Sequence, residues 1–203
     1  MRIFLATRNA GKIREMQRIL AEHLPDVEVL GLDDVTAYAE PAETEPTFAG
    51  NALIKAHAGV AATGLPSLAD DSGLCVDALN GMPGVLSARW SGTAKDDRAN
   101  NALLLQQLAD VPDERRTAHF SCAVAFVLPG GEEHVVHGEM HGRVVREPRG
   151  DGGFGYDPLF LADDRAPGDE RTSAELTVEE KDTVSHRGKA LREIAPLVAS
   201  LLA

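Results

Sequence analysis

Apolar and polar positions alternate along the chain in a way that predicts a strand, a helix and a second strand at its start. Residues 3–6 form a short apolar run typical of a buried strand, and residues 27–30 indicate another. Between them, apolar residues recur at helical spacing over residues 13–24, and Pro25 ends this predicted helix. The chain therefore opens as strand, polar loop and helix.

The central part of the chain continues this alternation. An alanine-rich stretch over residues 48–63 predicts a helix, with Gly64 as its C-terminal stop. Residues 67–69 and 74–76 predict two short strands, with the polar segment 70–73 as a turn between them. Residues 96–108 predict a further helix, whose acidic first turn suits the helix dipole.

The last third begins with strands and ends with helices. Residues 118–128 and 134–145 are rich in strand formers and predict a hairpin around Pro129, Gly130 and Gly131. Residues 177–180 form a capping box that opens a short helix, and a last helix starts near Gly188. Early alternation of strands and helices followed by a hairpin predicts an α/β fold with a mixed sheet.

Composition limits the class of protein. The 203 residues are 43% hydrophobic and 26% charged, which is typical of a globular chain, and we expect one domain over residues 1–203. The net charge of −12 argues against a nucleic-acid partner, and no apolar run reaches the ~20 residues of a membrane span. Cys75 and Cys122 lie in apolar runs, so we expect buried free thiols and a cytoplasmic location.

Charge is unevenly distributed along the chain. Basic residues dominate positions 1–20 and 181–192, whereas acidic residues dominate positions 21–80. Two basic islands in an acidic protein could bind a polyanion at a defined place, helped by a divalent metal bound to the acidic segment. The same pattern also fits charged helix faces exposed to solvent, and both interpretations stay open at this point.

Residues 7–12, Thr-Arg-Asn-Ala-Gly-Lys, connect the first predicted strand to the first predicted helix. A helix N-terminus offers unpaired N–H groups and a positive dipole end, and Lys12 and Arg8 add positive charge, so the segment suits a phosphate group. The glycine spacing of a Walker loop is missing. The alternative is an ordinary turn in which Asn9 caps the helix.

Two acidic segments could supply a metal site or a base. Asp70 and Asp71 are adjacent and point in different directions, and Glu43 in the acidic loop could complete a metal site with Asp71. An ionised carboxylate can also act as a base towards water. The alternatives are an ordinary Asp-Ser-Gly turn and a solvated acidic loop.

The late part of the chain holds an aromatic and a cationic segment. Residues 152–157 combine three glycines with Phe154 and Tyr156, so that a ring could stack on a base. Lys181 and Arg187 carry only hydrogen-bond donors, which suit a carbonyl oxygen or a phosphate. The alternatives are a structural glycine-rich turn and charge at helix ends.

The motifs occur in a specific order: TRNAGK, ETEPTFAGNALIKA, ADDSG, SARWSG, GDGGFGYDP and EKDTVSHRG. In this order the chain resembles, nearly end to end, the family of noncanonical purine nucleoside triphosphate pyrophosphatases. The resemblance implies a long mixed sheet flanked by helices, with two lobes and a central nucleotide-binding cleft. It also implies a cytoplasmic homodimer that uses Mg²⁺ to release a nucleoside monophosphate and pyrophosphate from inosine, deoxyinosine or xanthosine triphosphate.

The resemblance also implies roles for individual residues. Asp71 would be the catalytic carboxylate and a metal ligand with Glu43, beside Ser72 and the supporting Asp70. The triphosphate would be held by Thr7, Arg8, Asn9, Ala10, Gly11 and Lys12. The purine would stack on Phe154, next to Gly155, Tyr156 and Asp157. Its 6-oxo edge would be read by Lys181, His186 and Arg187.

The implied chemistry follows from the residue types. Asp71 would activate a water for attack at the α-phosphorus, and Lys12 would hold the leaving pyrophosphate. A 6-oxo group accepts hydrogen bonds from cationic side chains, whereas the 6-amino group of adenine repels them. Two departures from the family pattern are Glu45-Pro46, where a glycine and an apolar residue are common, and Trp90, where tyrosine is frequent.

Two other functions stay open from the sequence. A pyrimidine or modified-nucleotide pyrophosphatase would keep the phosphate loop and the acids but use a different base pocket. A non-enzymatic nucleotide sensor would bind the same ligand without releasing pyrophosphate.

Overall fold

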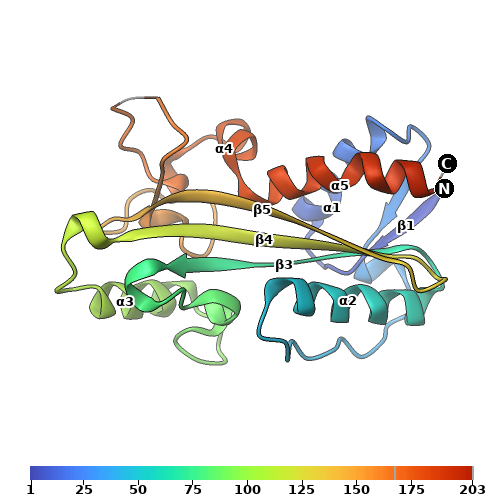
Figure 1. Cartoon of the computed structure of the whole chain (residues 1–203), viewed down its shortest axis with the longest axis horizontal. Coiled ribbons are helices and arrows are strands. Elements are labelled where there is room, and N and C mark those ends of the chain that lie inside the picture. The colour runs from blue at the N-terminus through green and yellow to red at the C-terminus, as the bar shows by residue number, and fades with distance from the viewer. Residues whose placement is uncertain (167, 203) are drawn as a thin grey trace. The chain divides into compact units, whose positions relative to one another are not determined.

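The computed structural model describes residues 1–166 and 168–202 and contains strands and helices in the predicted order (Figure 1). The strands are β1 (Arg2–Leu5), β2 (Glu28–Leu30), β3 (Ser67–Val76), β4 (Thr117–Val127), β5 (Glu133–Val144) and β6 (Phe160–Ala162). The helices are α1 (Ala10–Ala21), α2 (Phe48–Thr63), α3 (Asp97–Gln107), α4 (Val178–Val184) and α5 (His186–Leu202). Over the described residues, no helix combines the length and the apolar character that crossing a bilayer requires.

One mixed sheet joins the strands in the order β2-β1-β3-β4-β5-β6. β1 pairs in parallel with both β2 and β3, so that Phe4 lies opposite Leu30 on one side and Ser67 on the other. At the other end, β5 and β6 are antiparallel, with Val144 opposite Phe160. The predicted α/β class with a mixed sheet is therefore confirmed.

The chain forms two compact units, each built from separate stretches of sequence. The first unit comprises Met1–Asp71, Cys122–His137 and Lys189–Ala203, and the second comprises Ser72–Ser121 and Gly138–Gly188. β3, β4 and β5 contribute residues to both units, and the boundary in β3 falls between Asp71 and Ser72. These two neighbours in the sequence therefore belong to different units.

In the first unit, helices cover both faces of the sheet, with α1 and α5 on one face and α2 on the other (Figure 1). Successive β4 residues divide between these faces because side chains alternate along a strand. Those packed with α1 and α5 are Cys122, Val124 and Phe126, and those packed with α2 are Ala123, Ala125 and Val127. A strand covered on both sides is apolar throughout, as this segment is.

Small residues let α2 lie close to the sheet. Ala52 and Ala56 are fully buried, and Gly59 faces the ring of Phe4 in β1. A Cβ added to Gly59 would lie 2.7 Å from Cδ1 of Phe4, which is closer than carbon atoms can pack. The distance between α2 and β1 is therefore set by the missing side chain.

The core of the second unit surrounds α3 and the ends of the long strands. Leu104 of α3 and Leu108, which caps the end of this helix, pack with Tyr156 and Phe160. Phe120 meets the Phe160 ring edge-on, with 4.7 Å between centroids, an arrangement that suits aromatic quadrupoles. Cys75 and Cys122 are both buried and, in the described part of the chain, neither forms a disulfide, as predicted; burial raises the pKa of Cys75 to about 11.

Several predicted boundaries shift, and one prediction is wrong. Helix α1 begins at Ala10 and α5 at His186, earlier than predicted, and α5 continues through Pro196. The segment 70–73 is no turn, because β3 is continuous from Ser67 to Val76. β3 lies between β1 and β4 in the sheet, and this tertiary context overrides the local turn preference of Asp-Ser-Gly. No predicted element corresponds to the short strand β6.

We predict that Gly59→Ala destabilises the fold although alanine is the better helix former. The added methyl group collides with the buried Phe4 ring, and overpacking of this kind costs about 1–3 kcal/mol. Gly130→Ala in the hairpin loop is the control, since a Cβ there meets nothing within 4 Å. The free energies of unfolding from urea titrations measure both effects, and equal values for the two variants would contradict the close packing of α2 on β1.

Candidate active site

The polar loop before α1 is organised by its own side chains. The Asn9 Oδ1 atom accepts hydrogen bonds from the N–H groups of Gly11 at 2.8 Å and Lys12 at 3.3 Å, and Thr7 Oγ1 accepts from the Asn9 N–H. Asn9 therefore caps α1, which confirms the structural alternative for this segment. A helix cap fixes the loop without removing its basic side chains, so it is compatible with phosphate binding.

Both cations of this loop have carboxylate partners. Lys12 Nζ lies 2.9 and 2.7 Å from the two carboxylate oxygens of Asp70, which is almost fully buried. Arg8 bonds to Asp33 at 2.6 Å and to Glu40 at 2.8 Å, and hydrogen bonds from its guanidinium to these acids raise its pKa. The loop thus presents positive charge that is already balanced by nearby acids.

The two adjacent aspartates of β3 serve opposite faces of the sheet in the first unit. Asp70 bonds to Lys12 of α1, whereas Asp71 accepts hydrogen bonds from Asn51 Nδ2 and Lys55 Nζ of α2, each at 3.2 Å. The prediction that the two carboxylates point in different directions is confirmed. Strand alternation is the reason, because consecutive side chains in a strand leave on opposite sides.

Lys55 joins Asp71 to the acidic loop. Its Nζ atom lies 2.9 Å from Glu43 Oε1 and 3.2 Å from Asp71 Oδ1, so one ammonium group bridges two carboxylates. Glu43 and Asp71, the pair predicted as metal ligands, thus share a partner. The sequence motifs gave Asn51 and Lys55 no role, although their spacing of four residues on a predicted helix places them on one face.

Burial sets the protonation behaviour of this cluster. Burial raises the pKa of Asp71 above that of an ordinary aspartate and Glu43 adds to the rise, while the charge of Lys55 opposes it. For Lys55, burial lowers the pKa, but the carboxylates of Asp71 and Glu43 outweigh it and raise the pKa overall. The cluster therefore combines a lysine that stays charged with a carboxylate that is more basic than one in water.

A second cluster gathers in the second unit around Phe154. This ring is 58% exposed, with Lys181 Nζ 4.8 Å and Arg187 Cζ 5.9 Å from its centroid. Buried Asp157 accepts hydrogen bonds from Lys181 Nζ and, at 2.8 Å, from the Phe154 N–H. The structure thus brings together an exposed aromatic face and two cations, as cation–π attraction favours.

Other predicted base-binding residues have side chains in the core. Tyr156 is buried, and its hydroxyl donates to the carbonyl oxygen of Ser87 at 2.9 Å. His186 is also buried and stacks on Phe120, with 5.0 Å between ring centroids. Ser72 follows Asp71 in β3 and is the first residue of the second unit. The environments of Tyr156 and His186 favour support of neighbouring segments over direct contact with a base.

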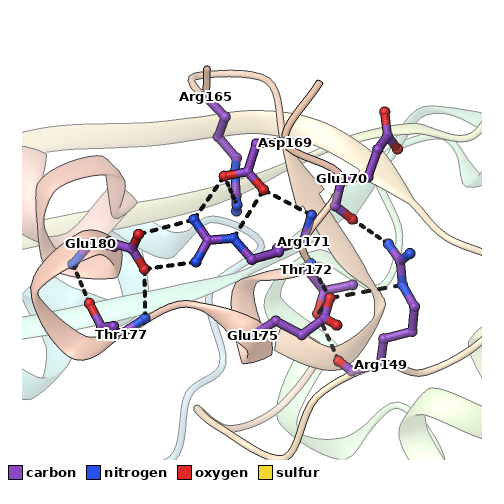
Figure 2. A network of polar contacts seen from close by, with 9 residues as sticks. All are labelled: Arg149, Arg165, Asp169, Glu170, Arg171, Thr172, Glu175, Thr177 and Glu180. Carbon is purple, nitrogen blue, oxygen red and sulfur yellow. Dashed lines mark hydrogen bonds and ion pairs between the residues drawn. The ribbon is translucent and has the colours of Figure 1, made fainter. Parts of the chain in front are cut away.

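A network of charged residues precedes Lys181 and fixes the start of its helix (Figure 2). The Arg171 guanidinium forms paired contacts with Asp169 on one side and with Glu180 on the other, at 2.9–3.1 Å. Glu180 also accepts from the Thr177 N–H at 2.9 Å, which completes the predicted capping box of α4. Lys181 is the next residue, so the network ties the segment before α4 to the position of this cation.

The chain matches known proteins over nearly its whole length. Residues 3–197 match the sequence model of the Ham1 family. The chain is 60% identical to a Nocardia farcinica protein named dITP/XTP pyrophosphatase, over 98% of this chain and 96% of that protein. It resembles a crystal structure of a nucleoside-triphosphatase / dITP/XTP pyrophosphatase from Mycobacterium abscessus, with 56% identity, a TM-score of 0.80 and coverage of 97% and 100% of the two chains.

A more distant relative has the same fold. The Ham1 protein of Staphylococcus aureus is 35% identical, with a TM-score of 0.88 and coverage of 99% of this chain and 100% of that one. Sequence and structure therefore agree over almost the whole length of the chain. This protein belongs to the Ham1 family.

Proposed function

We propose that this protein hydrolyses noncanonical purine nucleoside triphosphates to the nucleoside monophosphate and pyrophosphate. The substrates are inosine, deoxyinosine and xanthosine triphosphates. The observation that carries the proposal is the partly buried Glu43–Lys55–Asp71 cluster in a Ham1 chain that is 60% identical to a dITP/XTP pyrophosphatase. A cytoplasmic location and a homodimer, both implied by the family resemblance, are part of the same proposal.

The phosphate groups are assigned to the first unit. Arg8 lies in the loop before α1 and Lys12 in the first turn of that helix, where charge-assisted hydrogen bonds to phosphate oxygens would replace their present bonds to carboxylates. Asn9, through its bonds to the backbone, holds this loop in shape. Lys12 is the group that stabilises the charge of the departing pyrophosphate.

The donor set of the acidic cluster suits Mg²⁺. Among the described residues, no group of three or more His, Cys, Asp or Glu side chains could hold a metal ion by itself. Mg²⁺ is commonly held by one or two carboxylates together with substrate phosphates, and Glu43 and Asp71 supply two hard oxygen donors. When bound there, Mg²⁺ would neutralise phosphate charge and make a water molecule more acidic.

Asp71 is the proposed base. Its Oδ atoms accept a proton from the water that attacks the α-phosphorus, and the bond from that phosphorus to the β-bridging oxygen breaks as the new P–O bond forms. Burial keeps Asp71 more basic than a solvent-exposed carboxylate, and Lys55 and Asn51 hold its orientation. These two α2 residues orient the Asp71 carboxylate without touching the reacting bond.

The purine base is assigned to the second cluster. Phe154 offers an exposed ring face on which a purine can stack. Lys181 and Arg187 stand beside that ring and carry only donors, which favour the 6-oxo group of hypoxanthine and xanthine over the 6-amino group of adenine. Xanthine and hypoxanthine both lack the 2-amino group of guanine, so discrimination against guanine has to act on that group.

A pyrophosphate-release screen over the common and deaminated nucleoside triphosphates tests the proposal. With Mg²⁺ we expect rapid release from inosine, deoxyinosine and xanthosine triphosphates and slow release from the four standard nucleotides. Excess chelator should abolish release, because no divalent cation would then help the basic side chains to neutralise the triphosphate and make the attacking water more acidic. Preferred hydrolysis of thymidine triphosphate would favour a pyrimidine enzyme, and binding without release would favour a sensor.

Asp71→Asn should remove turnover and leave the fold intact. The amide keeps the shape and one acceptor oxygen, but it cannot take a proton, and loss of a general base costs about a hundredfold or more in kcat. Asp110→Asn is the control, since it makes the same change at an exposed aspartate outside the site. A steady-state assay with a thermal melt measures both, and turnover of Asp71→Asn near that of the unmodified protein would exclude Asp71 as the base.

Arg187→Ala should narrow the preference for inosine over adenosine triphosphate by about tenfold, the effect of one charge-assisted hydrogen bond. Its guanidinium stands beside the Phe154 ring, where it would favour a carbonyl oxygen on the base. The ratio of the two kcat/KM values is the measurement, with exposed Arg98→Ala as the control. If the ratio stays the same in both variants, Arg187 does not read the base.

A further inference from the structure

Phe154 is exposed, so packing alone does not fix its ring. The residue lies between Gly153 and Gly155, whose φ angles of +72° and +60° fall in the left-handed region that glycine tolerates. A chain segment with this freedom needs hydrogen bonds to hold one conformation. The direction of the Phe154 ring therefore depends on what binds the peptide groups around it.

Both polar groups of Gly155 are bound by side chains of α3. The Gly155 N–H donates to Asp97 Oδ2 at 2.8 Å, and its carbonyl oxygen accepts from Asn101 Nδ2 at 3.0 Å. Asp97 and Asn101 are four residues apart, so they lie one turn apart on the same helix face. Two side chains one turn apart on α3 thus hold the backbone of the residue that follows Phe154, one at its N–H group and the other at its carbonyl oxygen.

Helix α3 is itself firmly held, so it can act as a fixed support. Asp96 caps its first turn by accepting from the N–H groups of Arg98 and Ala99. Asn100 accepts from the Ser91 N–H and hydroxyl at 2.7 Å and donates to the carbonyl oxygen of Ala88. On the same helix, Leu104 is fully buried in the core of the second unit.

We propose that Asp97 and Asn101 are positioning residues that set the direction of the Phe154 ring and thereby the strength of base binding. This role rests on the proposed function, in which Phe154 stacks on the purine. Neither side chain needs to touch the nucleotide, because each acts through the Gly155 backbone. Their removal should weaken binding of the base and leave binding of the phosphate groups unchanged.

Asn101→Leu removes one of these two hydrogen bonds to Gly155 with little other change. Within the described residues, Asn101 Oδ1 has no hydrogen-bond partner, so an apolar side chain of similar size removes the hydrogen bond to Gly155 and little else. Gln106→Leu is the matched control, because it replaces an exposed amide of the same helix with the same residue. Asp97→Ala removes the other hydrogen bond, and because Asp97 is exposed, this substitution does not endanger the fold.

Calorimetric titrations with inosine monophosphate and with pyrophosphate, both with Mg²⁺, separate the two parts of the substrate. In Asn101→Leu and Asp97→Ala we expect the Kd for inosine monophosphate to rise about tenfold, the effect of one missing hydrogen bond. The Kd for pyrophosphate should not change, and Gln106→Leu should bind both ligands like the unmodified protein. Asp97→Asn should restore binding, since its amide oxygen can still accept from the Gly155 N–H.

Kinetics give a second readout. The KM for inosine triphosphate should rise in both variants while kcat stays within about twofold, because the stacked base is held similarly in the ground and transition states. Unchanged inosine monophosphate binding in both variants, or equal weakening of both ligands, overturns the positioning role. An unmodified protein that releases no pyrophosphate from inosine triphosphate overturns the proposed function itself, and that result is distinct from either outcome in the variants.

Discussion

The alternation of side chains along β3 is the constraint on which the chemistry of the first unit depends. Because consecutive residues leave a strand on opposite faces, Asp70 and Asp71 meet different helices although they are neighbours in sequence. One carboxylate is paired with Lys12 of α1, and the other is paired with Lys55 of α2. A turn at this position would leave the two acids free to share one environment. The continuous strand gives each a separate partner and a separate task.

The elements that could be predicted are those governed by local signals. Helix α2 has the predicted bounds because Thr47 caps its start and Gly64, at a φ of +69°, ends it. The capping box at Thr177 likewise placed α4 correctly. Where tertiary packing decides, prediction failed. Residues 70–73 have turn propensity, yet they belong to β3, which lies between β1 and β4 in the sheet, and no local signal reports these long-range strand pairings.

The residues of the candidate site likewise divide into those that local sequence patterns identify and those that only tertiary contacts reveal. Asp71, Lys12, Phe154 and Arg187 belong to motifs that are distinctive in the sequence, so they could be chosen without a structure. Lys55 became part of the site only once α2 was placed beside β3, because its contact with Asp71 joins residues that belong to different elements. The hydrogen bonds that join Asp97 and Asn101 to Gly155 connect residues more than fifty positions apart in the sequence, and no local sequence pattern predicts them. Long-range contacts of this kind can be identified only from a three-dimensional structure.

Three of the cations proposed to meet the substrate already have carboxylate partners: Arg8 with Asp33 and Glu40, Lys12 with Asp70, and Lys181 with Asp157. An arriving anion does not encounter bare positive charge at these positions and can bind only by exchanging with an internal counterion. The net gain in binding free energy is then the difference between the ion pair that forms and the internal ion pair that breaks. This difference is small for a weakly charged competitor such as chloride or bicarbonate. A multiply charged chain of phosphates can displace several counterions at once, so under the proposed function these ion pairs would select against solutes of low charge, whatever their shape.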